Sequence, residues 1–404
     1  MFSGLILSPE PNACRTIRRL SVDTHQVSIG GTLSHLPTPY EMDRIAITTC
    51  PDIVFIDLRA LDRSSLEILE DLRTALPGTA LVGFGSPPMS SRESIGVLEA
   101  VDACLGVAGG LDEFRNTVKE AIRCVDRTIH GNLFAFLPSK AGSGCSVTAL
   151  NIAGRVTTVL GRTVLLIDGD TRSGILSVLT GSSPRLELQD AIRSIHTIGR
   201  AEWHSNHVAS RFGADLLLGK PSTGRSLVEW HHYYQLLRFV SSEYDFVFVD
   251  LPEAVNDATA EAVSRARSVF IVCTPELLSI ELARQRKQEL AARGVDLGRV
   301  SVILNRATPR GIPPDRIEEL LDLQVAITLP NDYHSILEST INSEMVNSAS
   351  HLGRAYLAAA ETLVGAPISG DRESLVSRIA ATLGSDWMFS RRQKAKQLRA
   401  RAPS

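Results

Sequence analysis

A short apolar run that leads directly into a loop of small residues constrains this chain more than any other stretch. Residues 133–137 (LFAFL) predict a strand, residues 138–146 (PSKAGSGCS) predict a loop, and residues 147–160, rich in Ala, Leu and Val, predict a helix. This order points backbone N–H groups at one spot, where they bind an anion. Glycine in the loop lets the backbone come close. The stretch therefore predicts a phosphate-binding loop within an α/β fold.

The loop matches the pattern G-x-x-x-x-G-K-[ST] only in part. Gly144 and Ser146 match, and Ser146 is placed to ligate a Mg²⁺ that bridges two phosphates. Ser139 stands at the first glycine, and Cys145 stands at the lysine. That lysine normally contacts the β- and γ-phosphates as a point charge, which a neutral thiol cannot replace. Taken alone, the loop has a plain turn between strand and helix as its alternative explanation.

Polar residues follow three strand-like runs downstream of the loop. The predicted strands of this region, which extends from 131 to about 366, are Leu133–Leu137, Val164–Ile167, Leu216–Leu218, Phe246–Val249, Val269–Cys273, Val300–Leu304 and Val325–Leu329. Such runs predict a doubly wound, mostly parallel sheet that binds ligands beyond the carboxyl ends of its strands. We expect Asp170 to orient an attacking water, Asp250 to hold Mg²⁺ through water, and Asn305 to read an adenine edge. For each aspartate alone, a helix cap or turn is the alternative.

Residues 1–128 predict a separate, flavodoxin-like α/β unit. Apolar runs alternate with helical patterns, and a weak strand signal lies at 26–29. The order resembles a response-regulator receiver domain, in which Asp57 would be the phosphoacceptor and Ser86 the hydroxyl residue. The acidic pair of a receiver is replaced by Ser8-Pro9-Glu10, and residues 106–108 (GVA) lack its lysine. Phosphorylation of Asp57 is therefore not expected, and a docking or dimerisation module is favoured.

The composition excludes several classes of protein. Six cysteines are scattered without C-x-x-C spacing, which suits a reducing cytoplasm and argues against disulfides or zinc. We expect neither a signal peptide nor a transmembrane span. The net charge of −3 gives no global attraction to nucleic acid. A histidine-rich region, expected to be at the surface rather than at a zinc site, contains His196, His204, His207, His231 and His232. Residues 187–211 are predicted to be a variable, partner-facing segment.

The C-terminal residues 367–404 differ in composition from the rest. Apolar residues recur there at helical spacing, and a basic stretch without acids follows Asp386. Basic residues beside aromatics suit the surface of an anionic membrane. A solvated basic end, or a binding site for a partner protein, is the alternative.

The combination of motifs resembles a known family. SKAGSGCS, LLIDGD, YDFVFVDLP, FIVCTPE, VILNR and LPNDYHSILEST together resemble the MinD/ParA class of deviant P-loop ATPases. With the receiver-like front half, the chain resembles the TadZ/CpaE branch, which localises Flp-type (tight-adherence) pilus assembly. The resemblance implies ATP or ADP with Mg²⁺, and a homodimer in which Lys140 reaches across to the partner's nucleotide. It assigns catalysis to Asp170 and Lys140, and metal binding to Ser146 and Asp250. The implied nucleotide-binding residues are Lys140, Ala141, Gly142, Ser143, Gly144, Cys145, Ser146 and Asn305.

The predicted function is a nucleotide-dependent assembly factor for a pilus or secretion machine, with weak or absent hydrolysis because of Cys145. The implied location is the cytoplasm, at the cell pole and the periphery of the inner membrane. Two alternatives stay open: a partitioning ATPase that acts on DNA, which is not an expected partner, and a nucleotide-free docking scaffold.

Overall fold

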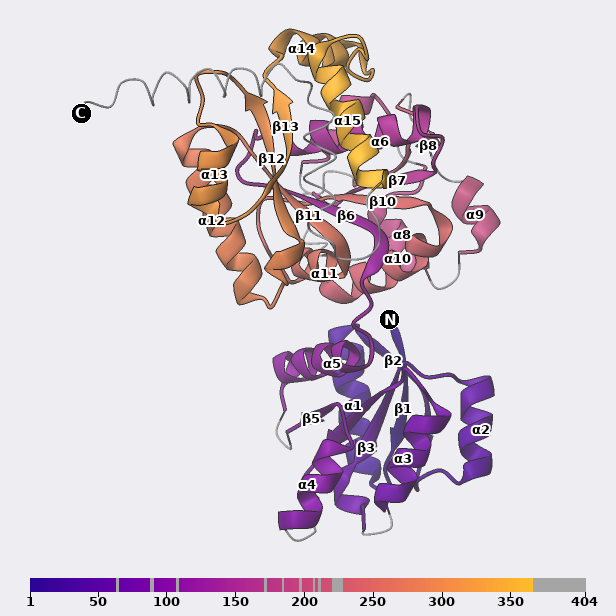
Figure 1. The fold of residues 1–404 in the computed structure, drawn as a ribbon. Helices are drawn as coiled ribbons and strands as arrows, with labels where there is room; N and C mark the ends of the chain where they lie inside the picture. Colours follow the sequence, from indigo (N-terminus) through magenta and orange to yellow (C-terminus); the bar gives the residue numbers. More distant parts are fainter. Residues whose placement is uncertain are drawn as a thin grey trace, which may run out of the picture. The chain divides into compact units, whose positions relative to one another are not determined.

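The chain forms two compact units, Met1–Thr128 and a second that begins at Ile129 (Figure 1). The computed structural model describes residues 1–62, 65–87, 91–106, 109–170, 173–183, 185–195, 198–205, 208–209, 212–219 and 228–365. The predicted basic segment 367–404 lies outside the described residues. Among the described residues, no helix combines the length and apolar character needed to cross a membrane.

The first unit is a five-stranded parallel sheet in the order β2-β1-β3-β4-β5. Its elements are β1 (Phe2–Leu7), α1 (Pro11–Thr24), β2 (Val27–Leu33), α2 (Pro39–Thr48), β3 (Ile53–Asp57), the 3-10 turn η1 (Leu58–Ala60), α3 (Ser65–Ala75), β4 (Ala80–Phe84), α4 (Ser91–Glu99), β5 (Ala103–Leu105) and α5 (Leu111–Val125). This strand order is the flavodoxin-like one. Strand β2 is an edge strand with alternating burial, which explains its weak sequence signal.

The second unit is an eight-stranded sheet in the order β13-β12-β11-β6-β10-β7-β9-β8. Its strands are β6 (His130–Pro138), β7 (Val164–Asp168), β8 (Val208–Ala209), β9 (Asp215–Leu217), β10 (Phe246–Asp250), β11 (Ala266–Cys273), β12 (Val300–Ala307) and β13 (Val325–Pro330). Every pair is parallel except β8 with β9. The predicted doubly wound, mostly parallel α/β fold is therefore confirmed.

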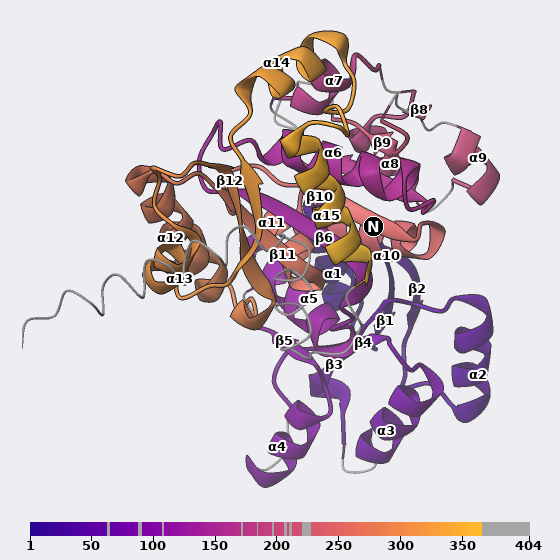
Figure 2. The same ribbon diagram turned by 45° about the horizontal axis from the view of Figure 1, so that its top comes forward.

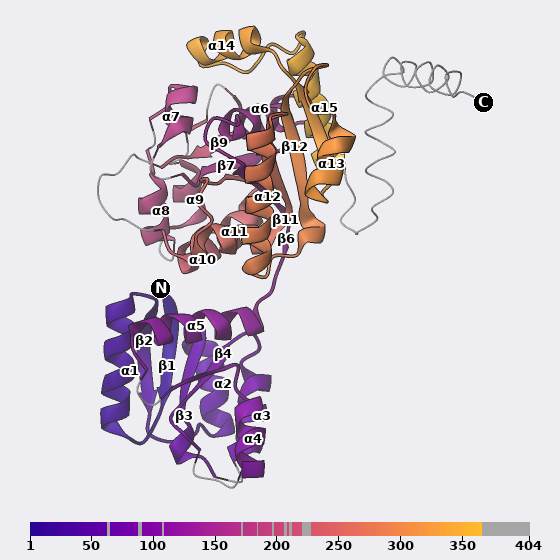
Figure 3. The same ribbon diagram turned by 90° about the vertical axis from the view of Figure 1, so that its left-hand side faces the viewer.

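Helices cover both faces of this second sheet. They are α6 (Cys145–Thr158), α7 (Ile175–Thr180), α8 (Leu188–Ser194), α9 (Arg200–Ser205), α10 (Trp230–Glu243), α11 (Asp257–Arg265), α12 (Leu277–Ala292), the 3-10 turn η2 (Leu297–Arg299), α13 (Pro314–Leu321), α14 (Tyr333–Asn342) and α15 (His351–Gly365). One buried cluster joins the sheet to α8 and α10–α13, and a second joins it to α6, α7 and α15. Helix α15 lies beside α6 (Figure 2), and α12 lies beside α13 (Figure 3).

Helix α6 is bound to the connection between α14 and α15 by two side chains. The Val346 N–H donates to Asn151 Oδ1 at 2.9 Å, and the Arg155 guanidinium donates to the Val346 carbonyl. Both side chains come from α6, and both are buried. The helix that follows the predicted phosphate loop is thus fixed to a segment far away in the sequence.

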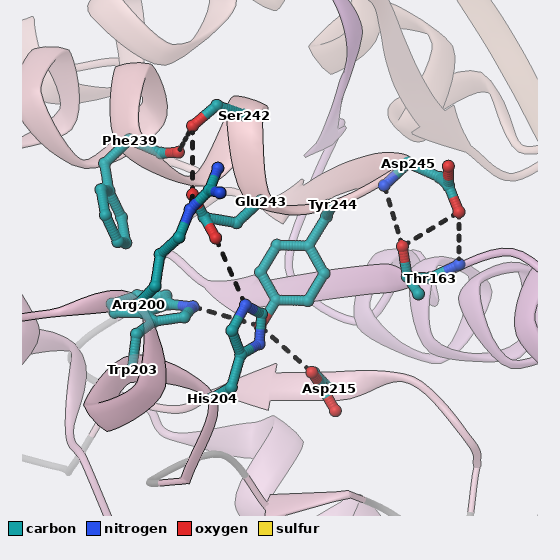
Figure 4. A network of polar contacts seen from close by, with 10 residues as sticks. All are labelled: Thr163, Arg200, Trp203, His204, Asp215, Phe239, Ser242, Glu243, Tyr244 and Asp245. Carbon is teal, nitrogen blue, oxygen red and sulfur yellow. Dashed lines mark hydrogen bonds and ion pairs between the residues drawn. The ribbon is translucent and has the colours of Figure 1, made fainter.

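A polar network lies at the amino-terminal edge of the second sheet (Figure 4). The buried Trp203 of α9 donates from Nε1 to the Tyr244 hydroxyl at 3.2 Å, and that hydroxyl donates to Asp215 Oδ2 at 3.1 Å. The carboxylate of Glu243 pairs with Arg200 at 2.6 Å and with His204 at 3.3 Å. Helix α9 is therefore anchored to the end of α10, on the sheet edge opposite the predicted phosphate loop.

Candidate functional site

The predicted loop joins β6 to α6 with two glycines in the left-handed region. Gly142 has φ 76° and Gly144 has φ 87°, backbone conformations that residues other than glycine rarely adopt. A Cβ at Gly144 would also collide with the Asn305 amide nitrogen. The backbone and Asn305 therefore both require glycine at position 144, immediately before the first residue of α6.

The residue at the lysine position contacts an acid instead of carrying a charge. The Cys145 thiol and the Ser146 hydroxyl both lie beside the carboxyl group of Asp250, which ends β10. Burial, and next the nearby Asp250 carboxylate, raise the pKa of the Cys145 thiol well above its ordinary value. Burial raises the pKa of Asp250 to about 6, against the hydrogen bonds from Ser146 and Cys145. The start of α6 thus holds a neutral thiol beside a buried carboxyl group.

A second carboxyl group, that of Asp168, lies beside Asp250. Strand β7 pairs with β10 so that Asp168 is opposite Asp250, and both side chains are buried. Burial, followed by the charges of Asp250 and Asp170, raises the pKa of Asp168 to about 8. Among the described residues, Asp168 Oδ2 and Asp250 Oδ1 have no hydrogen-bond partner. Buried oxygens without partners are typical of a place that binds a cation or water.

The hydroxyl of Tyr233 is a further buried polar atom near this edge. It has no hydrogen-bond partner within the described part of the chain, and burial together with the charge of Asp168 raises its pKa. A Cβ at Gly169 would lie 2.7 Å from this oxygen, so the glycine between Asp168 and Asp170 makes room for it. Sequence reasoning missed Tyr233, because a tyrosine within an amphipathic helix carries no signal of its own.

The shifted pKa of Asp168 predicts that the protein loses stability as the pH rises. The folded pKa of about 8 lies above the ordinary value of 3.8, so the folded state binds the extra proton between these values. Between pH 6 and pH 8, without metal or nucleotide, we expect the free energy of unfolding to fall by roughly 2 kcal/mol. Urea denaturation at pH 6, 7 and 8 measures this change. An Asp168→Asn variant with the same pH dependence as the wild type would contradict it.

Two acids that the sequence analysis did not assign lie against the loop. The Ala141 N–H donates to Glu253 Oε2 at 3.0 Å, and Lys140 Nζ lies 3.7 Å from Glu276 Oε2. Glu253 follows β10 and Glu276 follows β11, the two strands that flank β6 in the sheet. Both acids therefore follow strand ends as Asp250 does, and the same sequence signal marks them.

Asn305 and Asp170 reach the same edge but have protein partners. The Asn305 amide donates to the Ser143 carbonyl at 2.9 Å, and its oxygen accepts from the Arg306 N–H at 2.9 Å. The Ser173 hydroxyl donates to Asp170 Oδ2 at 2.6 Å. Base reading by Asn305 therefore stays a prediction that requires new partners for its amide.

Asp57 belongs to the first unit and has an internal counter-ion. Arg59 donates to both carboxylate oxygens at 2.9 Å, and the Ser8 hydroxyl donates to Oδ2 at 2.7 Å. Burial acts to raise the pKa of Asp57, but these hydrogen bonds outweigh it and hold the pKa below its ordinary value. A phosphoryl group would have to displace these donors. The candidate hydroxyl residue Ser86 is exposed, and residues 107–108 lie outside the described part of the chain.

The expectation that the histidines lie at the surface was wrong for His231. This residue is buried at 1% exposure in α10, and its Nδ1 lies 3.5 Å from Glu229. His204 is exposed on α9, and His196 and His207 lie outside the described residues. No group of three or more His, Cys, Asp or Glu residues that could hold a metal ion occurs within the described ranges.

The chain is similar to ATPases of known families. It is 26% identical to the septum site-determining protein MinD of Synechocystis over 216 residues, which are 51% of this chain and 79% of that protein. It is 25% identical to an uncharacterized ATP-binding protein of Methanocaldococcus jannaschii over 247 residues, which are 59% of this chain and 90% of that protein. A ParA family ATPase from Chlorobium tepidum shares the fold, with a TM-score of 0.53 and 22% identity. The match covers 57% of this chain and 98% of that one. No protein family model matches the chain.

Proposed function

We propose that this chain, a homologue of the MinD and ParA P-loop ATPases, binds an adenine nucleotide with Mg²⁺ and acts as a nucleotide-dependent positioning factor. The observation that carries the proposal is the placement of Ser146 and Asp250 together at the glycine loop, with a buried carboxylate oxygen of Asp250 lacking a partner. Homology to MinD-type proteins supports the same conclusion.

The residues at the loop fit a magnesium nucleotide. Mg²⁺ prefers oxygen ligands, and Ser146 and Asp250 supply a hydroxyl and a carboxylate at the start of α6. Bound there, the metal would neutralise charge on the phosphate oxygens. Backbone N–H groups of residues 140–146 would hold the phosphates, with Asn305 beside the base. Asp170 follows β7 at the same edge, where it would orient water.

Hydrolysis is expected to be slow or absent. Cys145 is neutral and buried, so the start of α6 lacks the charge that normally meets the β- and γ-phosphates. Lys140, paired with Glu276, remains the lysine of the loop. In the proposed homodimer it leaves Glu276 and contacts the partner's nucleotide, which makes dimer formation depend on the ligand.

The proposed cellular role is the positioning of Flp-type pilus or secretion machinery. The combination of the nucleotide-binding unit with a front unit of flavodoxin-like strand order supports this role, as do the motifs of the TadZ/CpaE branch. In this proposal the front unit docks partners, and the basic residues of segment 367–404 bring the protein to an anionic membrane surface near the cell pole.

The test measures binding and oligomeric mass on the full chain. Isothermal titration should show binding of Mg-ATP and Mg-ADP to the wild type, and light scattering should show a dimer with ATP. We expect Lys140→Ala to retain binding but to stay a monomer, whereas the control Lys119→Ala, on α5 of the other unit, should behave as the wild type. No binding at millimolar nucleotide, with an unchanged melting temperature, would overturn the proposal in favour of a nucleotide-free scaffold.

A further inference from the structure

We propose that Glu253 determines which nucleotide the site prefers, because its carboxylate takes the place of the terminal phosphate on the loop. The inference rests on the proposed nucleotide-binding function and adds a specificity to it. Without a triphosphate, the Glu253 carboxylate occupies the Ala141 N–H of the loop. ATP has to displace this carboxylate, whereas ADP does not.

The contact that carries the inference is the hydrogen bond from the Ala141 N–H to Glu253 Oε2, at 3.0 Å. Backbone N–H groups of such a loop bind phosphates, and a carboxylate is the protein's own anion of matching chemistry. Glu253 comes from the connection after β10, so the contact joins residues far apart in the sequence. It is a tertiary contact between two strand ends rather than a local turn.

A buried arginine lies on the other side of this carboxylate. Arg286 Nη2 is 4.0 Å from Glu253 Oε1, and the Arg286 side chain, from α12, is only 10% exposed. The Glu253 side chain is 42% exposed and can therefore leave without the core opening. Glu253 thus lies between an N–H group and a guanidinium, in a position that a solvent-borne anion can compete for.

The position of Ala141 indicates which phosphate competes. Ala141 lies at the strand-side end of the loop beside Lys140, whereas Ser146 and Asp250 meet at the helix-side end. In phosphate loops the α- and β-phosphates occupy the helix-side N–H groups, and a third phosphate extends away from them. Glu253 therefore opposes the third phosphate by occupying its N–H donor and by like-charge repulsion. Cys145 supplies no cation to offset that repulsion.

The experiment compares dissociation constants for Mg-ATP and Mg-ADP by titration of the full chain. We expect Glu253→Ala to raise the affinity for Mg-ATP on the order of tenfold, the size of one charge-assisted contact, and to change that for Mg-ADP less than twofold. Glu253→Gln keeps a hydrogen-bond acceptor without the charge, so its affinity for Mg-ATP should lie between those of the wild type and Glu253→Ala. Glu289→Ala is the matched control, because Glu289 pairs with Nη1 of Arg286 whereas Glu253 lies near Nη2, and no contact joins Glu289 to the loop within the described residues. It should leave both constants unchanged.

Several outcomes would overturn the inference. An unchanged or weaker affinity of Glu253→Ala for Mg-ATP would show that Glu253 does not compete with the third phosphate. An equal gain for ATP and ADP, or the same gain in Glu289→Ala, would show a general effect of charge. If neither nucleotide binds to the wild type or to any variant while circular dichroism shows folded protein, the proposed function itself fails.

Discussion

Replacing Cys145 with lysine should raise the affinity for Mg-ATP roughly tenfold to a hundredfold and should raise ATP turnover by a larger factor. A charge-assisted contact contributes about 1.5–3 kcal/mol, which gives the change in affinity. The rate should gain more, because phosphoryl transfer depends mainly on stabilising charge in the transition state. Titration calorimetry and a phosphate-release assay on the full chain measure the two effects.

The contacts of Cys145 define the control for this substitution. Its thiol is a neutral group beside Asp250, so Cys145→Ser keeps a neutral group at the same place and should change neither affinity nor rate more than a few-fold. In the absence of nucleotide, a lysine beside Asp250 should lower the pKa of that carboxyl group below its present value of about 6. A wild-type protein that already hydrolyses ATP as fast as Cys145→Lys would show that the thiol does not weaken the site.

Replacing Trp203 with alanine should lower the free energy of unfolding of the second unit by about 3–5 kcal/mol, the usual cost of removing a fully buried aromatic side chain. Trp203 is completely buried, its ring meets Phe239 edge-on at 5.1 Å, and its N–H donates to Tyr244 (Figure 4). Because this network lies at the amino ends of β9 and β10, the nucleotide affinity of the folded protein should stay the same.

The matched control is Trp203→Phe, which keeps an aromatic ring but removes the N–H donor. It should lose less stability than the alanine variant, because most of the buried apolar surface remains. Urea denaturation followed by far-ultraviolet circular dichroism measures both variants. If Trp203→Ala were no less stable than Trp203→Phe, α9 would not depend on this side chain for its attachment.

Much of the sheet could be predicted because buried parallel strands leave continuous apolar runs. Residues 164–167 and 246–249 show such runs, and both are strands in the structure. Strand β8 was not predicted, because it has only two residues and pairs with one neighbour, β9. Strand β2 gave a poor signal since its outer face is open to solvent and interrupted by glycine.

The site was predictable only where a strand end and a chemically distinctive side chain coincide. Asp250 and Asn305 satisfy both conditions, and the structure brings them to the loop. Tyr233 satisfies neither, since its position depends on how α10 packs over Gly169. The position of His231 was predicted wrongly because a histidine within a helix carries no information about the helix face that it occupies.

The two hydrogen bonds that α6 makes to Val346 have a mechanical consequence. Val346 is held at both its N–H and its carbonyl, so it cannot move relative to α6 without losing these bonds in a buried setting, where unpaired polar groups are costly. Any tilt of α6, the helix that follows the glycine loop, must therefore also move the segment between α14 and α15. Asn151 and Arg155 make this part of the molecule stiff.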